Sequence, residues 1–314
     1  MALDLATSEL VAAMRSADGK PLHESQPEEV RQGGGMLSQM IGPGPDLHRS
    51  TDHSLKTPDG AEFTVRVLVP HGQPDAVILY FHGGGWVTGN IDEWDTLGRQ
   101  LATRSNCTVA MVNYRKAPEF PYPSPVEDAW LSLVWAHENL VTLAGGPVPL
   151  VVAGDSAGGN LAAVVAQRAV SRSGPELALQ VLVYPVTDAD QTTVSYLDPE
   201  NQVLLTAEGM AWFWNHYAPE SRRGEPEASP LRAVDLRGLP PAVILLAEHD
   251  PLRTEGEAYA EALRAADIPV QTHLFEGQSH GFFSMPNLLP GASAGLDYAV
   301  QNIRAALESA VPHA

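Results

Sequence analysis

Residues 150–164 read Leu-Val-Val-Ala-Gly-Asp-Ser-Ala-Gly-Gly-Asn-Leu-Ala-Ala-Val, and the expected fold class rests on them. An apolar run typical of a strand enters Gly154-Asp-Ser-Ala-Gly158, and an apolar run typical of a helix follows at once. This is a G-x-S-x-G turn in the strand–turn–helix context that the motif requires. The turn is so tight that a Cβ on either glycine would strike neighbouring backbone. We therefore predict that Ser156 is strained, exposed at the positive end of a helix dipole, and nucleophilic.

Other parts of the chain repeat this alternation of strand and helix. Residues 48–70 have strand-like periodicity, with apolar and polar residues alternating in their second half. Apolar runs that suit strands buried on both faces follow at 76–81, 108–112, 150–153, 179–184 and 242–246. Between and after them, helical spacing occurs at 92–103, 125–140, 157–171, 253–266 and 294–309. The pattern predicts an α/β fold, with a mainly parallel central sheet flanked by helices.

Two segments do not belong to the alternation. Residues 1–45 show helical spacing before the first strand, and residues 189–230 interrupt the strand–helix order. The second segment carries large side chains at helical spacing, namely Met210, Trp212, Phe213, Trp214 and Tyr217. We expect 1–45 and 189–230 to form one helical cap over the strand ends. Residues 46–188 and 231–314 then form the α/β catalytic domain.

Charge excludes some classes of partner. The chain of 314 residues has 19 basic and 38 acidic side chains, a formal net charge of −19. Such a field opposes binding to nucleic acid and to anionic membrane surfaces. A hydrophobic fraction of 44% is ordinary for a globular protein with a large core. We therefore expect a soluble protein, and the charge gives no reason to expect a strongly anionic substrate.

Cysteine content and the absence of targeting patterns bear on location. The one cysteine, Cys107, excludes an intrachain disulfide and starts an apolar run, so we expect a buried thiol. The first 20 residues lack the basic start and apolar centre of a secretory signal. No apolar stretch approaches the ~18 residues that a membrane span needs. These patterns predict a cytoplasmic protein with no membrane span.

A glycine-rich loop follows the run at 76–81. His82-Gly-Gly-Gly85-Trp86 lets the chain approach a substrate carbonyl closely, because three successive residues have no side chain. Acyl transfer needs backbone N–H groups that bind the developing oxyanion. We expect donors from Gly84 and Gly85, or from Gly83 and Gly84, together with the N–H of Ala157. The ring of His82 is expected to hold the loop by hydrogen bonds.

A serine nucleophile needs a base, and the base needs an acid that orients it. Asp250 follows the apolar run at 242–246, and His280 follows a strand-like run that begins at Val270. Both therefore lie where the carboxyl edge of the sheet would place them. Glu248 is an alternative acid. Two further histidines lie nearby, and we expect each to make local hydrogen bonds only, namely His249 and His273.

These strings together resemble one family, the bacterial hormone-sensitive-lipase-like esterases (family IV carboxylesterases) of the α/β-hydrolase superfamily. The resemblance covers nearly the whole chain. The family's HGGGW/F, GDSAGGN, YRLAPE-x-P-x-P, DPLRDEGEAYA and HGF strings are matched at 82–86, 154–160, 114–123, 250–260 and 280–282. Two residues depart from the pattern: Lys116 replaces a leucine and Thr254 replaces an acidic residue.

The resemblance implies a serine carboxylesterase for short- to medium-chain esters that works through an acyl-enzyme. It implies the triad Ser156, Asp250 and His280, no metal, no cofactor, the cap described above, and often a homodimer. Alternatives on the same machinery are an amidase, a formamidase or a deacetylase. A ligand-binding receptor that has lost catalysis is a further alternative, although such proteins typically lose the serine or the histidine.

The substrate pocket is the least determined part of the expected site. We assign to it residues near the motifs or in the predicted cap, namely Trp86, Asp155, Tyr184, Trp212, Phe213 and Phe282. The aromatic side chains of the cap helix can equally form the core of the cap itself.

Overall fold

The computed structural model describes residues 2–16 and 20–310, and within them eight strands form one sheet in the order β1-β2-β4-β3-β5-β6-β7-β8. β2 pairs antiparallel with β1 and β4, and all other neighbours are parallel. The strands are β1 (Arg49–Lys56), β2 (Glu62–Val69), β3 (Val77–Phe81), β4 (Thr108–Asn113), β5 (Leu150–Asp155), β6 (Leu179–Val183), β7 (Ala242–His249) and β8 (Val270–Ser279).

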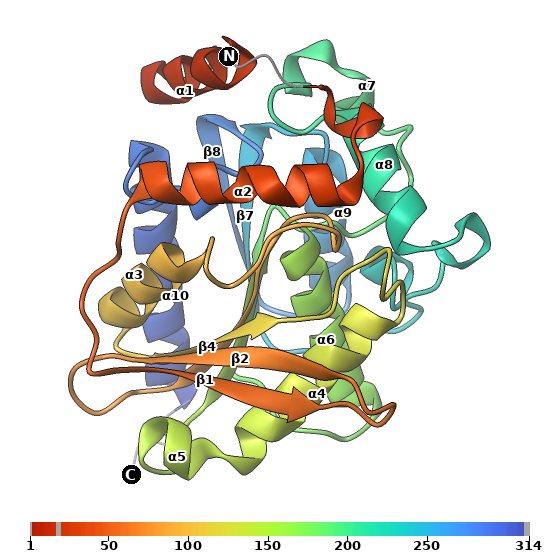
Figure 1. Ribbon diagram of the computed structural model, residues 1–314. Helices are drawn as coiled ribbons and strands as arrows, with labels where there is room; N and C mark the ends of the chain where they lie inside the picture. Colours follow the sequence, from red (N-terminus) through yellow and green to blue (C-terminus); the bar gives the residue numbers. More distant parts are fainter. Residues whose placement is uncertain (1, 17–19, 311–314) are drawn as a thin grey trace.

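Helices cover both faces of this sheet (Figure 1). On one face lie α3 (Asp95–Ser105) and α10 (Pro290–Ala310), and on the other α4 (Ser124–Glu138), α5 (Leu140–Ala144), α6 (Ala157–Ser171) and α9 (Arg253–Ala265). Each face has its own hydrophobic core. Ile78 and Tyr80 of β3 belong to the core under α3 and α10, and Leu79 and Phe81 belong to the core on the opposite face. Because both faces are buried, every residue of this strand is apolar or aromatic.

The predicted α/β fold is confirmed. Each apolar run expected to be a strand forms one, and no end differs from the prediction by more than three residues. The helix expected from residue 92 begins only at Asp95. The reason is local, because Oδ1 of Asn90 accepts the backbone N–H groups of Asp92 (2.9 Å) and Glu93 (3.2 Å). Residues 91–94 therefore form a turn.

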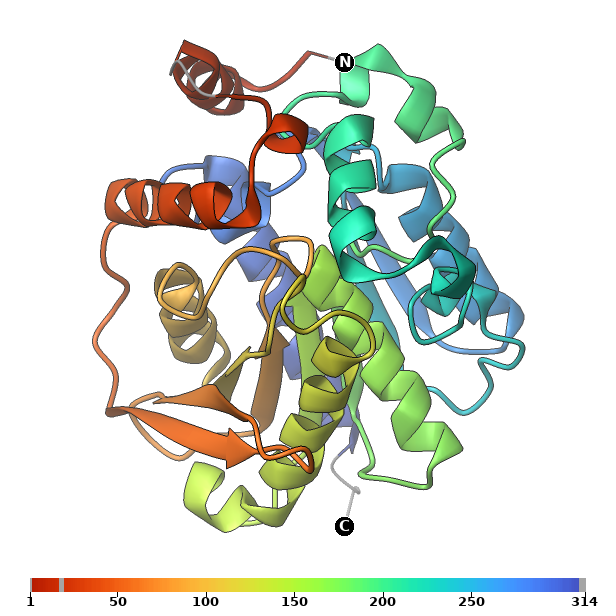
Figure 2. The ribbon, with the colours of Figure 1, turned by 45° about the vertical axis from the view of Figure 1, so that its right-hand side comes forward.

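The two segments outside the alternation lie at the same end of the molecule (Figures 1 and 2). The first forms α1 (Leu5–Ser16), η1 (Leu22–Glu24) and α2 (Pro27–Ile41), and the second forms α7 (Val194–Leu197), η2 (Pro199–Asn201), α8 (Ala207–Tyr217) and η3 (Glu220–Arg222). The indole N–H of Trp212 on α8 donates to the carbonyl of Ser25, 3.1 Å away. The two segments thus contact each other, while the boundaries of a separate cap stay a prediction.

Cys107, directly before β4, is fully buried, as expected. Burial raises the pKa of its thiol to about 11, so the thiol stays protonated at neutral pH. In the described ranges, none of the helices is both long enough and apolar enough to pass through a membrane.

Candidate active site

The turn that carries Ser156 joins β5 directly to α6. Ser156 has φ 56° and ψ −119°, a conformation that is strained for a residue with a side chain. Backbone hydrogen bonds hold it there: its N–H donates to Val183 O (2.9 Å), and its carbonyl accepts from Asn160 N (3.0 Å) and Val186 N (3.2 Å). The strain is therefore maintained by β6, by the first turn of α6 and by the chain that follows β6.

The glycines of the turn have no room for a side chain. A Cβ on Gly158 would lie 1.9 Å from the carbonyl oxygen of Phe81, and one on Gly154 would lie 2.3 Å from the carbonyl oxygen of Gly158. Both obstacles are backbone atoms, which cannot rotate away. The parallel register sets Phe81 beside Gly154, so the ends of β3 and β5 meet at this point.

Three side chains form a hydrogen-bonded row. His280 Nε2 lies 2.9 Å from Ser156 Oγ, and His280 Nδ1 lies 2.7 Å from Asp250 Oδ2. The other carboxylate oxygen of Asp250 accepts the N–H of Leu252 at 2.8 Å. Asp250 is fully buried, and Ser156 is only 7% exposed. The fold thus brings together residues that lie 124 positions apart in the chain.

The alternative acid and histidines make other contacts. Glu248 Oε2 accepts the N–H of Gly277 at 2.7 Å, on the neighbouring strand. His249 Nδ1 lies 3.2 Å from the carbonyl of Glu200. The ring of His273 packs against two aromatic rings, those of Phe275 and Tyr298. None of these three residues therefore belongs to the hydrogen-bonded row at Ser156.

The glycine-rich loop between β3 and α3 contacts Asp155, the residue before Ser156, and carries backbone donors. The N–H of Gly83 is occupied, because it donates to Asp155 Oδ1 at 3.0 Å. Gly84 and Gly85 have φ values of 100° and 58°. Within the described residues, the N–H groups of Gly84, Gly85 and Ala157 donate to no protein acceptor. Of the two glycine pairs considered from the sequence, this leaves Gly84 and Gly85 as the free one.

Asp155 supports this loop from below. Its Oδ1 accepts from the Tyr80 hydroxyl (2.8 Å), the Gly83 N–H (3.0 Å) and the Trp94 indole N–H (3.0 Å). Its side chain is buried, and burial raises the pKa of the carboxyl to about 6. The sequence had suggested a place in the substrate pocket. In the structure, these three donors hold the Asp155 carboxylate under the loop, and its place in the pocket stays a prediction.

His82 holds the start of the loop, as expected. Its Nδ1 lies 2.7 Å from the carbonyl of Gly83, and its ring stacks on Tyr114 with centroids 4.5 Å apart. The hydroxyl of Tyr114 donates back to the carbonyl of His82 at 2.9 Å. Burial lowers the pKa of His82, so the ring is neutral.

The aromatic residues of the predicted pocket divide into two groups. Trp86 is fully buried and stacks on Tyr217 with centroids 4.0 Å apart, so it joins the loop to α8 rather than lining an open pocket. Phe213 lies against Gly85, where a Cβ would be 2.1 Å from its ring. The ring of Tyr184 lies 4.5 Å from that of His280 and 5.7 Å from that of Phe282. Tyr184 therefore contacts the triad histidine, and Phe213 contacts the glycine-rich loop.

Sequence reasoning missed Arg31, a residue of α2 that reaches the far end of the loop. Its Nε donates to Val87 O (2.8 Å), and its Nη2 donates to Ala117 O (2.7 Å). Glu119 pairs with both terminal nitrogens of the guanidinium, at 2.7 and 2.8 Å. No motif surrounds this arginine, so only the packing of α2 reveals its role.

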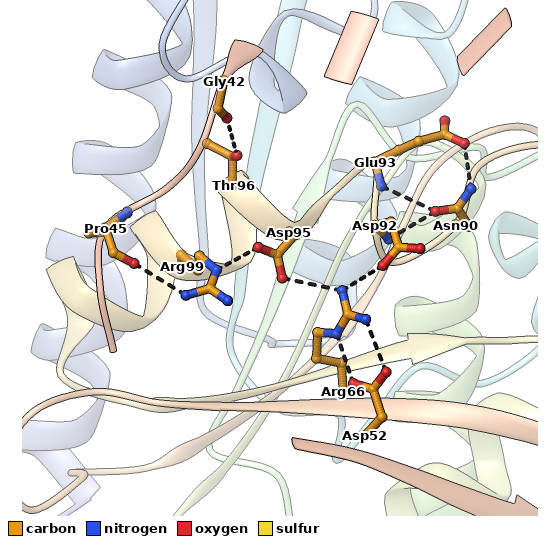
Figure 3. Close-up of polar contacts among 10 residues, drawn as sticks. All are labelled: Gly42, Pro45, Asp52, Arg66, Asn90, Asp92, Glu93, Asp95, Thr96 and Arg99. Atoms are coloured by element: carbon orange, nitrogen blue, oxygen red, sulfur yellow. Dashed lines mark hydrogen bonds and ion pairs between the residues drawn. The ribbon is translucent and has the colours of Figure 1, made fainter. Parts of the chain in front are cut away.

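A second polar network anchors residues 90–95, which close the loop (Figure 3). Arg66 on β2 donates to Asp52 (2.8 and 3.0 Å), to Asp92 (2.7 Å) and to Asp95 (3.3 Å). Asp95 in turn pairs with Arg99 one turn later on α3. The ion pairs of Arg66 with Asp92 and Asp95 thus attach the end of the loop to the sheet.

No group of three or more His, Cys, Asp or Glu side chains in the described ranges is arranged to hold a metal ion. The groups gathered at the site are a serine, a histidine, a carboxylate and backbone N–H donors. Their chemistry is that of nucleophilic acyl transfer.

Comparison with known proteins agrees with this geometry. Residues 78–284 match a family described as having the alpha/beta hydrolase fold. The carboxylic ester hydrolase LipN of Mycobacterium tuberculosis is 41% identical over 274 residues (84% of this chain, 73% of LipN). The ethyl acetate hydrolase of Pseudomonas putida is 36% identical over 305 residues (94% of this chain, 96% of that protein).

A solved structure resembles the whole fold. An ester hydrolase from the metagenome of Lake Arreo, complexed with a bipyridine phosphonate derivative, superposes with a TM-score of 0.90 at 33% identity. The match covers 96% of this chain and 98% of that one. The chain therefore belongs to the α/β-hydrolase family, in the hormone-sensitive-lipase-like branch whose motifs it carries.

Proposed function

We propose that this protein is a serine carboxylesterase that hydrolyses small, short- to medium-chain carboxylic esters through an acyl-enzyme. The observation that supports this best is the row Ser156–His280–Asp250, with bond distances of 2.9 and 2.7 Å, beside unoccupied backbone donors. Relatives of this chain that are 36–41% identical include proteins named as ester hydrolases.

The first half-reaction transfers the acyl group to the enzyme. His280 Nε2 accepts the proton of Ser156 Oγ as the oxygen attacks the ester carbonyl carbon. Asp250 receives the Nδ1–H of His280, which fixes the tautomer and stabilises the imidazolium that forms. His280 then protonates the departing alcohol. In the second half, water takes the place of the serine hydroxyl and the acid is released.

The oxyanion of each tetrahedral intermediate is bound by backbone N–H groups. We assign these donors to Gly84, Gly85 and Ala157, and not to Gly83, since Gly83 donates to Asp155. Donors that are already oriented need no reorganisation when charge develops, which is why such a site lowers the barrier.

The test is hydrolysis of a series of p-nitrophenyl esters from acetate to laurate. Ser156→Ala and His280→Ala should each lower kcat by about 10⁴-fold or more, because each removes a member of a unit that acts together. Ser171→Ala, at the far end of α6, serves as the matched control and should retain the wild-type rate. Labelling of wild type but not of Ser156→Ala by a fluorophosphonate probe would identify the nucleophile. Turnover near the wild-type rate in either triad variant would overturn the assignment.

Assembly and location extend the proposal. We propose that the enzyme works as a homodimer in the cytoplasm, on the basis of the family resemblance and the sequence patterns given above. Light scattering on the purified chain measures its mass in solution and so tests the homodimer. Fractionation of cells that express the full gene tests the cytoplasmic location.

A further inference from the structure

The strand that leads to His280 bulges out of the sheet shortly before that residue. The pairing of β7 with β8 joins Ala247 to Phe275, and it resumes at His249, which pairs with Ser279. One residue of β7 therefore opposes three residues of β8, which are Glu276, Gly277 and Gln278. Bulges beside active sites commonly change the direction of a side chain. This bulge ends two residues before His280, so its shape sets the direction in which the chain delivers the imidazole ring.

Groups from outside the strand ladder hold the backbone of this bulge. The N–H of Gly277 donates to Glu248 Oε2 at 2.7 Å, and the carbonyl of Gly277 accepts from the N–H of Asp4 at 3.0 Å. Gly277 has a φ of 69°, and a Cβ there would lie 2.9 Å from the Asp4 nitrogen. The residues directly before α1 therefore pack against the bulge.

The side chain of Gln278 makes a second connection between the bulge and α1. Gln278 is only 3% exposed, and Thr7 is fully buried. The amide nitrogen of Gln278 donates to Asp4 Oδ2, and its Oε1 accepts from Thr7 Oγ1 at 3.3 Å. On its other side, the amide packs against Gly291, where a Cβ would collide with it. A buried amide needs both of its partners, so these contacts fix the position of Gln278 relative to α1.

Asp4 joins the bulge to the first turn of α1 (Figure 1). Its Oδ1 accepts the N–H of Thr7 at 2.7 Å, and its carbonyl accepts the N–H of Ser8 at 2.8 Å. The side chain thus caps the helix in the way that is usual for an aspartate at this position. Since the same carboxylate binds Gln278, a displacement of α1 also displaces the bulge.

Little chain separates this contact from the reacting groups. Only Ser279 lies between Gln278 and His280, and Ser279 is buried and belongs to the ladder with β7. The ring of His280 must stay within hydrogen-bonding distance of Ser156 Oγ (2.9 Å) and Asp250 Oδ2 (2.7 Å). A misplacement of about 1 Å can lower the rate by about 10²-fold.

We propose that Gln278, held by Asp4 and Thr7, is a positioning residue for His280. The contact fixes the bulge before His280 and thereby the direction of the ring that accepts the Ser156 proton. The N-terminal helix is then a support of the active site as well as part of its cover. This inference rests on the proposed esterase function and deepens it, because it names residues on which the base of that reaction depends.

The first test replaces one amide by a carboxylate of the same size. Gln278→Glu places a second negative charge against the Asp4 carboxylate, and the repulsion should move the bulge. At pH 8, kcat for p-nitrophenyl acetate should fall about tenfold while KM stays within about twofold of the wild-type value. Gln271→Glu adds the same charge to an exposed position of β8 and should keep the wild-type kcat. Melting temperatures report whether each variant is folded.

The second test restores the contact with its polarity reversed. In the double variant Gln278→Glu/Asp4→Asn, the introduced amide can donate to the introduced carboxylate, and its oxygen can still accept the N–H of Thr7. Its kcat should return to within about twofold of the wild-type value. A double variant as slow as Gln278→Glu would overturn the proposal.

Two further outcomes separate this inference from the esterase proposal. If Gln278→Glu lowers the melting temperature but keeps the wild-type kcat, the contact only anchors α1 and this inference is overturned, while the esterase proposal stands. A wild-type protein that hydrolyses no ester would overturn both.

Discussion

The turn at Ser156 and the glycine-rich loop beside it are held by different kinds of contact. The turn depends on backbone: three main-chain hydrogen bonds meet at Ser156, and Gly158 touches the main chain of Phe81. The loop depends on side chains from distant segments, namely Asp155, Arg31, Arg66 and Tyr217. A local motif can therefore specify the turn, while the loop needs the assembled fold.

This difference also separates two kinds of sensitivity. A change in the turn meets atoms that cannot move, so it should affect folding itself. A change in the side chains around the loop should leave the fold intact and alter the placement of two N–H groups. The following predictions are ordered by expected effect.

Gly158→Ala should have the largest effect. Its Cβ would lie 1.9 Å from the carbonyl oxygen of Phe81, so β3 and α6 must separate. We expect a loss of about 3 kcal/mol or more of unfolding free energy, or no folded protein. Urea denaturation measures the free energy of unfolding. Gly146→Ala is the control, because nothing lies within 4 Å of the added carbon. Equal stability of the two variants would contradict a turn held by its backbone.

Asp155→Ala should lower kcat by about 10- to 100-fold, because the Gly83 N–H loses its acceptor and the adjacent donors lose their fixed position. Asp155→Asn is the matched variant, since its amide oxygen can replace Oδ1. It should retain more activity than the alanine variant. Stopped assays with p-nitrophenyl butyrate, together with fluorophosphonate labelling of Ser156, measure both. If alanine and asparagine were equally active at the wild-type level, the loop would not need this support.

Arg31→Met should reduce kcat/KM several-fold with little change in the melting temperature. It removes the donors to Val87 and Ala117 but keeps the aliphatic part of the side chain. Arg49→Met is the control, since Arg49 is a partly exposed residue that donates to Thr142 O, away from the loop. Steady-state kinetics with a short and a long ester would show whether α2 acts on the loop for both. The idea fails if Arg31→Met and Arg49→Met have the same kinetics.

Gly35→Ala should have the smallest effect and the opposite sign. Gly35 lies inside α2 with nothing within 4 Å of an added Cβ, so alanine should stabilise the protein by about 0.5–1 kcal/mol. Gly34→Ala places its Cβ 2.3 Å from Glu93 Oε2, and the movement this requires should cancel the gain. Melting temperatures of the two variants test this. Equal stabilisation would show that the Glu93 side chain moves aside at no cost in stability.

Much of the fold could be predicted because its signals are local. The apolar runs at β3, β4 and β5 are continuous, since both faces of each strand are buried. The start of α3 was placed three residues too early, because the side chain of Asn90 holds a turn that periodicity does not reveal. A side chain that captures backbone donors leaves little trace in a hydrophobic pattern.

The candidate site shows the same division. Ser156, Asp250 and His280 each follow a strand at the carboxyl edge of the sheet, so their motifs make them candidates without coordinates. The role of Asp155 beneath the loop was not found, because it depends on Tyr80 and Trp94, which come from other segments. The choice between Glu248 and Asp250 also needed the structure, since only geometry shows which carboxylate meets His280.

The sequence alone determined the α/β class, the glycine-bounded turn and the candidate nucleophile, acid and base. It could do so because these features arise from contacts between neighbours in the chain and from the repeating strand–helix pattern. The tertiary structure decided which N–H groups stay free for an oxyanion and how Arg31 and Asp155 hold the loop. Each of these is a contact between residues far apart in the chain, and such contacts exist only after the segments have packed together.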